Sequence, residues 1–119
     1  MVKSYSDLIV WNKAIDLVTQ VYRATQNFPK DELFGLTNQI RRAAISIPSN
    51  IAEGRGRLTK GEFKLFLGHA RGSLAELETQ IVIAKNLDYL DDIEGNKLLQ
   101  QIAEVGRILN GLLSSIKKQ

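Results

Sequence analysis

Residues 63–84 read FKLFLGHARGSLAELETQIVIA, and this stretch carries the strongest structural signal in the chain. Its apolar residues recur at alternating spacings of four and three, at Phe63, Leu67, Ala70, Leu74, Leu77, Ile81 and Ala84. That period of 3.5 residues predicts one long helix that packs against its neighbours at a shallow angle. Thr59 and Glu62 form a capping-box pattern, so we expect the helix to begin there and to end between Asn86 and Asp88.

The same helical period extends over most of the chain on both sides of this stretch. It predicts helices over residues 7–27 and 31–54, and a last helix that begins after the capping pair Asp91 and Asp92. Strand-like alternation is absent from the sequence. Short turns between long helices favour an antiparallel, up-down-up-down order. The sequence therefore predicts an all-α four-helix bundle, with residues 1–119 as a single domain.

Two positions should distort the predicted second helix. Gly35 allows a break near its start. Pro48 lies inside it and has no N–H to bond the Ala44 carbonyl, while its ring crowds the preceding turn. We therefore expect this helix to be kinked at Pro48.

Composition and charge limit the class of protein. The 119 residues include no cysteine. They contain no apolar run near the ~20 residues that span a bilayer, and the first residues show no signal-peptide pattern. We therefore expect a cytoplasmic protein without membrane association. The formal net charge is only +3. The excess is nevertheless concentrated, because residues 41–71 carry seven basic and two acidic side chains.

Residue patterns typical of catalysis or metal binding are missing. The chain has one histidine, His69, and no Glu-x-x-His motif of the kind that holds di-iron centres in bundles. No nucleophile elbow is present, and the glycines at Gly54 and Gly56 are followed by no Gly-Lys-Ser/Thr. We expect no catalytic residues, no metal site, no cofactor and no enzymatic activity.

The basic residues of the middle third form the best candidate for a functional surface. We call them the basic cluster and interpret them as possible phosphate contacts in RNA or DNA. No aromatic residue is interleaved to stack bases, so binding would be directed mainly at the backbone. The basic cluster comprises Arg41, Arg42, Arg55, Arg57, Lys60, Lys64 and Arg71.

Polar side chains flank the apolar faces of the second and third helices at helical spacing. A solvated face is the plain interpretation. Short polar residues also suit a hydrogen-bonded contact between these two helices or between subunits, because buried polar groups must be paired. We call this set the polar seam, and it comprises Ser46, Asn50, Glu53, Ser73 and Glu76.

The first helix carries two parallel apolar stripes, a wider arc than one bundle core requires. A monomer that exposed this arc would tend to associate with other proteins or with itself. We therefore predict that the helix contributes to an oligomer interface, with Val10, Trp11, Ala14, Leu17 and Val21 as the contact residues.

Several segments resemble a known family. The run at 39–54, QIRRAAISIPSNIAEG, together with residues 8–11, 34–37, 62–63 and 72–80, resembles the bacterial "four helix bundle protein" family, whose founding members are encoded in intervening sequences of 23S rRNA genes. Residues 103–109 resemble part of the accessory variability protein of diversity-generating retroelements, a basic, barrel-shaped pentamer that binds nucleic acid and a reverse transcriptase. The resemblance implies an up-down bundle, a homopentamer and no known enzymatic activity.

Two functions fit these observations. The first is a non-enzymatic nucleic-acid-binding or scaffolding protein that acts as a ring-shaped homo-oligomer and contacts structured RNA, such as rRNA, through the basic cluster. The second is a protein–protein adaptor whose ring carries a protein partner and touches no nucleic acid. An enzymatic role would require a ligand pocket near Arg42, Asn50, Glu53 and Glu76.

Overall fold

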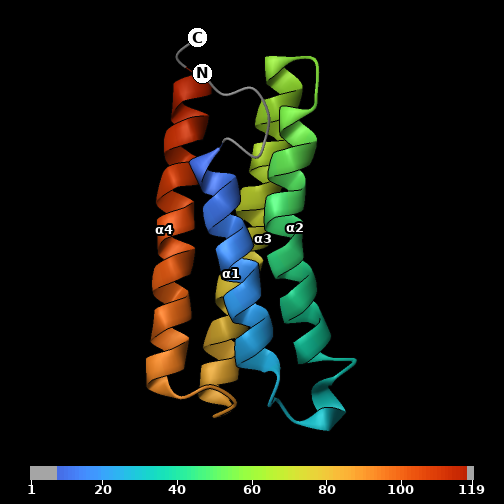
Figure 1. Ribbon diagram of the computed structural model, residues 1–119, viewed down its shortest axis with the longest axis vertical. Helices are drawn as coiled ribbons and strands as arrows, with labels where there is room; N and C mark the ends of the chain where they lie inside the picture. Colours follow the sequence, from blue (N-terminus) through green and yellow to red (C-terminus); the bar gives the residue numbers. More distant parts are fainter. Residues whose placement is uncertain (1–7, 118–119) are drawn as a thin grey trace.

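The computed structural model describes residues 8–117. Within that range the elements are α1 (Ile9–Thr25), a 3₁₀ turn η2 (Lys30–Glu32), α2 (Leu36–Arg55), α3 (Lys60–Asn86) and α4 (Asp92–Lys117). Figure 1 shows the four α-helices side by side, with the chain direction reversing at each turn from α1 (blue) to α4 (red). The particle measures 46 × 24 × 19 Å, so the helices run along its long axis. The described residues thus form the expected all-α, antiparallel bundle.

The heptad pattern of α3 faces the core as predicted. Leu67, Leu77, Ile81 and Ala84 are completely buried, and Phe63 at the start of the pattern is only partly covered. The buried apolar side chains of α4 are spaced by four, three, four and four, so that Leu113 is buried and Leu112 is only partly covered. They are Leu98, Ile102, Val105, Leu109 and Leu113. A straight helix has 3.6 residues per turn rather than 3.5, so a strict heptad pattern rotates out of the core over several turns.

The break predicted near the start of the second helix is present at Gly35, so α2 begins at Leu36 rather than at residue 31. Residues 31–35 do not continue into the helix, because the backbone at Gly35 (φ −113°, ψ −115°) is not helical. The 3₁₀ turn precedes it instead, and the Glu32 carboxylate accepts the Leu36 N–H at 3.3 Å. The helix then continues without a break through the buried Pro48. A kink at Pro48 stays a prediction.

The first helix requires a correction. Val10, Ala14, Leu17 and Val21 are at most 1% exposed and lie in the core of the bundle, so they cannot touch a second subunit. Only Trp11 of the predicted interface residues is partly exposed. The prediction failed because the width of an apolar arc does not reveal which of its two stripes the other helices cover. The predicted helix start at Asp7 lies outside the described residues.

The second apolar stripe of α1 is not fully covered by the other helices. It borders an apolar groove between α1 and α2. This groove has a volume of about 340 Å³, and Ile15 and Ile45 on its sides are 38% and 42% exposed. We call it the apolar groove, and it is lined by Trp11, Ile15, Val18, Ile45, Pro48, Ser49 and Ala52. No helix within residues 8–117 combines the length and apolarity needed to cross a membrane.

Candidate nucleic-acid interface

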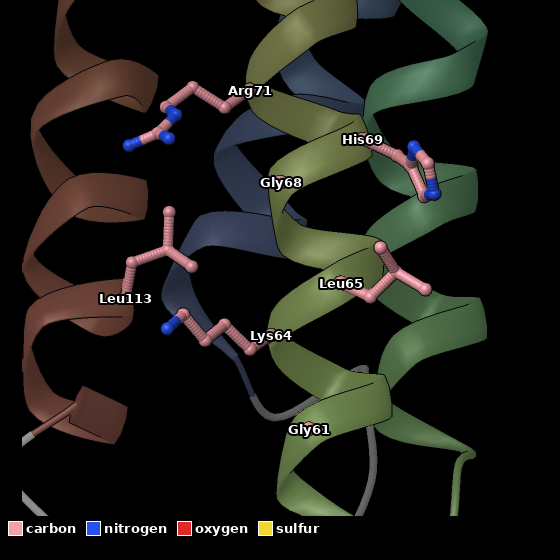
Figure 2. Close-up of a pocket in the computed structure, with 7 residues that line it drawn as sticks. All are labelled: Gly61, Lys64, Leu65, Gly68, His69, Arg71 and Leu113. Atoms are coloured by element: carbon pink, nitrogen blue, oxygen red, sulfur yellow. The ribbon is translucent and has the colours of Figure 1, made fainter.

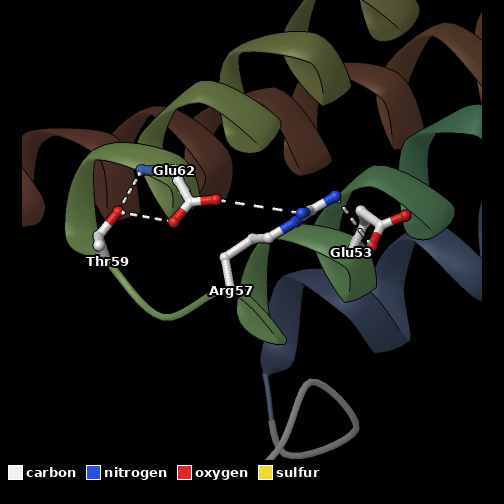
Figure 3. A network of polar contacts seen from close by, with 4 residues as sticks. All are labelled: Glu53, Arg57, Thr59 and Glu62. Atoms are coloured by element: carbon white, nitrogen blue, oxygen red, sulfur yellow. Dashed lines mark hydrogen bonds and ion pairs between the residues drawn. The ribbon is translucent and has the colours of Figure 1, made fainter.

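Arg57 stabilises the loop between α2 and α3 through contacts with both helices (Figure 3). Arg57 Nη2 lies 3.4 Å from Glu53 Oε2, and Arg57 Nη1 lies 4.0 Å from Glu62 Oε2. The same guanidinium stacks over Phe66, 4.6 Å from the ring centre. At the other end of the loop, Thr59 Oγ1 accepts the Glu62 N–H at 3.1 Å and its hydroxyl donates to Glu62 Oε1 at 3.1 Å. The charge of Arg57 is therefore largely balanced by neighbouring carboxylates.

Three other cations of the basic cluster lie on one face of α3. Lys60, Lys64 and Arg71 are four and seven residues apart, so they share a helix face and span about 16 Å along the axis. All three are exposed. Figure 2 shows Lys64 and Arg71 extending toward α4. We call these three residues the α3 stripe.

Two residues of the α3 stripe, Lys64 and Arg71, border a shallow hollow of about 520 Å³. Gly61 and Gly68 line this hollow (Figure 2). A Cβ added at either glycine would have no other group within 4 Å, so the helix surface is open there. Leu113 from α4 closes one side, and Arg71 Nη1 donates to Asn110 Oδ1 at 3.4 Å. The hollow therefore offers two exposed cations beside an accessible helix surface, which suits phosphate groups.

The structure separates Arg41 from this end of the bundle. Its Nε donates to Thr25 Oγ1 at 2.9 Å, and its guanidinium lies 4.6 Å from the centre of the Tyr22 ring. Arg41 is 14 residues before Arg55 on α2, which is about 21 Å along the helix. Arg41 therefore joins α2 to α1. Arg55 lies near the loop, with its guanidinium 5.7 Å from the centre of the Phe63 ring.

One hydrogen bond of the polar seam crosses from α2 to α3, between Ser46 and Ser73, and Asn50 supports it from within α2. Ser46 Oγ and Ser73 Oγ are 2.8 Å apart, and Asn50 Nδ2 donates to Ser46 O at 2.8 Å and to Ser46 Oγ at 2.9 Å. The other two members have different surroundings: Glu53 pairs with Arg57, and Glu76 lines a cleft. The short side chains thus connect the two helices, whereas the two carboxylates face outward.

That cleft also contains Arg42 and has a volume of about 480 Å³. We call it the Phe34 cleft, because Phe34 borders it and is 91% exposed. Sequence reasoning missed Phe34, since it lies within the predicted second helix, where a large apolar residue is normally assigned to the core. The signal that was available is its place directly before Gly35, outside the helical period.

The lone histidine has an ordinary environment. His69 packs edge-on against Phe66, with 5.6 Å between ring centres. Within residues 8–117 no three histidine or carboxylate side chains are grouped as metal ligands would be.

A family model for the 23S rRNA-intervening sequence protein matches residues 6–111. The chain belongs to this family. Among solved structures it is similar to a protein of unknown function from the S23 ribosomal protein family of Bacteroides thetaiotaomicron, with a TM-score of 0.80 and 19% identity. The alignment covers 88% of this chain and 98% of that one, so the two share the fold. No curated protein matches the chain. The resemblance of residues 103–109 to the accessory variability protein stays a prediction.

Proposed function

We propose that this family member is a non-enzymatic RNA-binding scaffold that acts in the cytoplasm as a ring-shaped homo-oligomer on structured RNA, such as rRNA. The observation that carries the proposal is the α3 stripe. Its three cations lie on one exposed face, and no ion pair with a carboxylate is found for them among the described residues. Exposed cations that form no ion pair keep their attraction for phosphate, because no fixed carboxylate competes for them.

The spacing of the α3 stripe supports contact with a nucleic-acid backbone. Lys60 and Lys64 are separated by about 6 Å along the axis, and Lys64 and Arg71 by about 10 Å. Side chains of this length reach phosphates on one strand without a change in the helix. Such contacts carry little sequence information, so they position the protein on RNA rather than select a sequence.

Assembly would strengthen the interaction. The excess charge of one chain is only +3, and a ring of identical subunits multiplies it into a field that attracts RNA at a distance. The apolar groove supports assembly, because exposed apolar surface of this kind is typical of subunit contacts. We place the subunit contact there instead of at the buried stripe of α1.

The test is a titration of labelled rRNA hairpins over a range of salt concentrations. We expect affinity to rise steeply as salt falls. Replacing Lys60, Lys64 and Arg71 by Gln should make the slope of log K against log salt shallower by about 2 to 3 for each subunit in contact.

The matched control removes three positive charges elsewhere, by replacing Arg23, Lys97 and Arg107 on α1 and α4 with Gln. It should bind nearly as the unmodified protein does. Failure to bind any hairpin at low salt, or equal losses in the two triple variants, would refute the proposal.

The apolar groove favours a second candidate, an adaptor for a protein partner. An Ile15→Glu or Ile45→Glu variant places a charge at the side of the groove without touching the core. If this change abolishes association in cells while the α3 stripe variant retains it, the adaptor function is the better description. Light scattering of both variants separates loss of a partner from loss of self-assembly.

A further inference from the structure

The Phe34 cleft lies on the flank of α3 opposite the α3 stripe. It is formed by the first half of α2, by Glu76 of α3 and by the ring that precedes Gly35. Its polar lining consists of two amides, one guanidinium, one hydroxyl and one carboxylate, from Asn38, Gln39, Arg42, Ser46 and Glu76. Gln80, one helical turn after Glu76 on α3, is 6% exposed, and its Oε1 has no partner among the described residues.

The turn that carries Phe34 is held from both sides. The Glu32 carboxylate accepts the Leu36 N–H at 3.3 Å and the Tyr89 hydroxyl at 2.9 Å. Tyr89 in turn packs against Phe28, with 5.4 Å between ring centres. A Cβ at Gly35 would lie 2.9 Å from Glu32 Oε1, so glycine leaves room for this carboxylate. The backbone that carries Phe34 is therefore held by the fold, and its ring extends into solvent at the border of the cleft.

We propose that the Phe34 cleft binds one unstacked base of RNA, with the Phe34 ring as its stacking surface. This inference rests on the proposed RNA-binding function and adds the part of the RNA that is recognised. Single-stranded loops and bulges are the usual targets of specific RNA recognition, because their bases can leave the helix and stack on aromatic side chains. An exposed aromatic ring beside polar groups is the arrangement that such a base requires.

Four of the five polar groups of the cleft can contact the nucleotide, and the fifth, the Ser46 hydroxyl, is already hydrogen-bonded to Ser73 and Asn50. The amides of Asn38 and Gln39 offer both donors and acceptors, which match the mixed edge of a base. Arg42 supplies a cation for the phosphate of the same nucleotide. Glu76 accepts only, so it suits an amino group of the base or the 2′-hydroxyl.

The cleft and the α3 stripe can act on the same RNA molecule. They lie on two flanks of α3 and at different heights along the bundle. Lys64 is near the end of α2, whereas Phe34 precedes its start, and the 20 residues of α2 span about 30 Å. A bulged hairpin that contacts both must therefore extend along the bundle, with its backbone against Lys64 and Arg71 and its free base against Phe34. The stripe would supply salt-dependent affinity, and the cleft would select RNA that carries an unpaired base.

The experiment compares two hairpins, one fully paired and one with a single bulged 2-aminopurine, whose fluorescence is quenched by stacking. We expect the bulged hairpin to bind at least about fivefold more tightly and its emission to fall. Phe34→Leu keeps an apolar side chain without a π face and should lose both effects. Phe34→Trp should retain them, and Leu58→Ser, at a site 98% exposed near the other end of the bundle, should change neither.

The outcomes separate this inference from the proposed function. If the paired hairpin binds at low salt and the bulge gives no advantage, the base-binding cleft is refuted and the α3 stripe stands. If neither hairpin binds at low salt, both proposals fall. The inference is also overturned if Phe34→Leu preserves the preference for the bulge, or if it changes only the oligomeric state measured by light scattering.

Discussion

Gly54→Ala should destabilise the bundle, although alanine is the better helix former. Gly54 is buried in the last turn of α2, where this helix meets α3. An added Cβ would lie 2.8 Å from Phe66 Cβ and 3.2 Å from Phe63 O. Comfortable carbon contacts are about 3.5 to 4.0 Å. Both obstacles belong to the α3 backbone or its first side-chain atom, so the helices must separate near the α2–α3 loop.

The magnitude follows from two opposing effects. Overpacking a close contact costs about 1 to 3 kcal/mol, and we expect the upper part of this range because no flexible side-chain end can move away. Replacing a helical glycine by alanine contributes about 1 kcal/mol of stability. The net prediction is a loss of about 1 to 2 kcal/mol in the free energy of unfolding, or roughly 3 to 10 °C in the melting temperature.

The matched control is Gly72→Ala on α3, where an added Cβ has open space within 4 Å. That variant should gain about 0.5 to 1 kcal/mol. Urea unfolding followed by circular dichroism measures both variants, with the m-value as a check that the unfolded states are comparable. If Gly54→Ala is as stable as Gly72→Ala, the close approach of α2 and α3 is not a constraint and the reasoning fails.

Three other changes test individual contacts. Ser46→Ala and Ser73→Ala should show a coupling of about 0.5 to 1.5 kcal/mol in a double-mutant cycle measured by urea unfolding, whereas simple additivity would contradict their hydrogen bond. The hydrogen bond to Glu32 raises the pKa of Tyr89 above 10.0. Its stabilisation is therefore present below pH 10 and lost as the pH rises further, and Tyr89→Phe should flatten the fall in melting temperature measured from pH 9 to 11. Arg41→Gln should lower the free energy of unfolding by about 1 kcal/mol, because this side chain contacts Thr25 and Tyr22 of α1. The same variant should leave RNA affinity at low salt unchanged. A clear loss of affinity would show that Arg41 belongs to the RNA-binding surface.

Much of the local structure follows from short-range patterns. The heptad positions of residues 63–84 predicted both the helix and its buried face, because a side chain's direction depends only on its place in the helical turn. The capping pair Thr59 and Glu62 likewise acts within one turn. The hydrogen-bonded part of the polar seam was also accessible, since Ser46 and Ser73 occupy flanking positions on adjacent helices.

The contacts between distant parts of the chain depended on the tertiary structure. Periodicity shows that α1 has a wide apolar arc, but only the packing of the other helices decides that Ala14 is covered and Ile15 is not. The residues of the basic cluster all lie between positions 41 and 71. A helix turns each successive residue by about 100° and advances it by about 1.5 Å, so residues close in sequence face different directions. Arg41 therefore contacts α1, whereas Lys64 faces the solvent. The turn that leaves Phe34 exposed is stabilised by a hydrogen bond between Glu32 and Tyr89, which lie 57 residues apart in the chain. The sequence alone determined the helices and most of their inner faces; tertiary packing determined which side chains remain outside to bind.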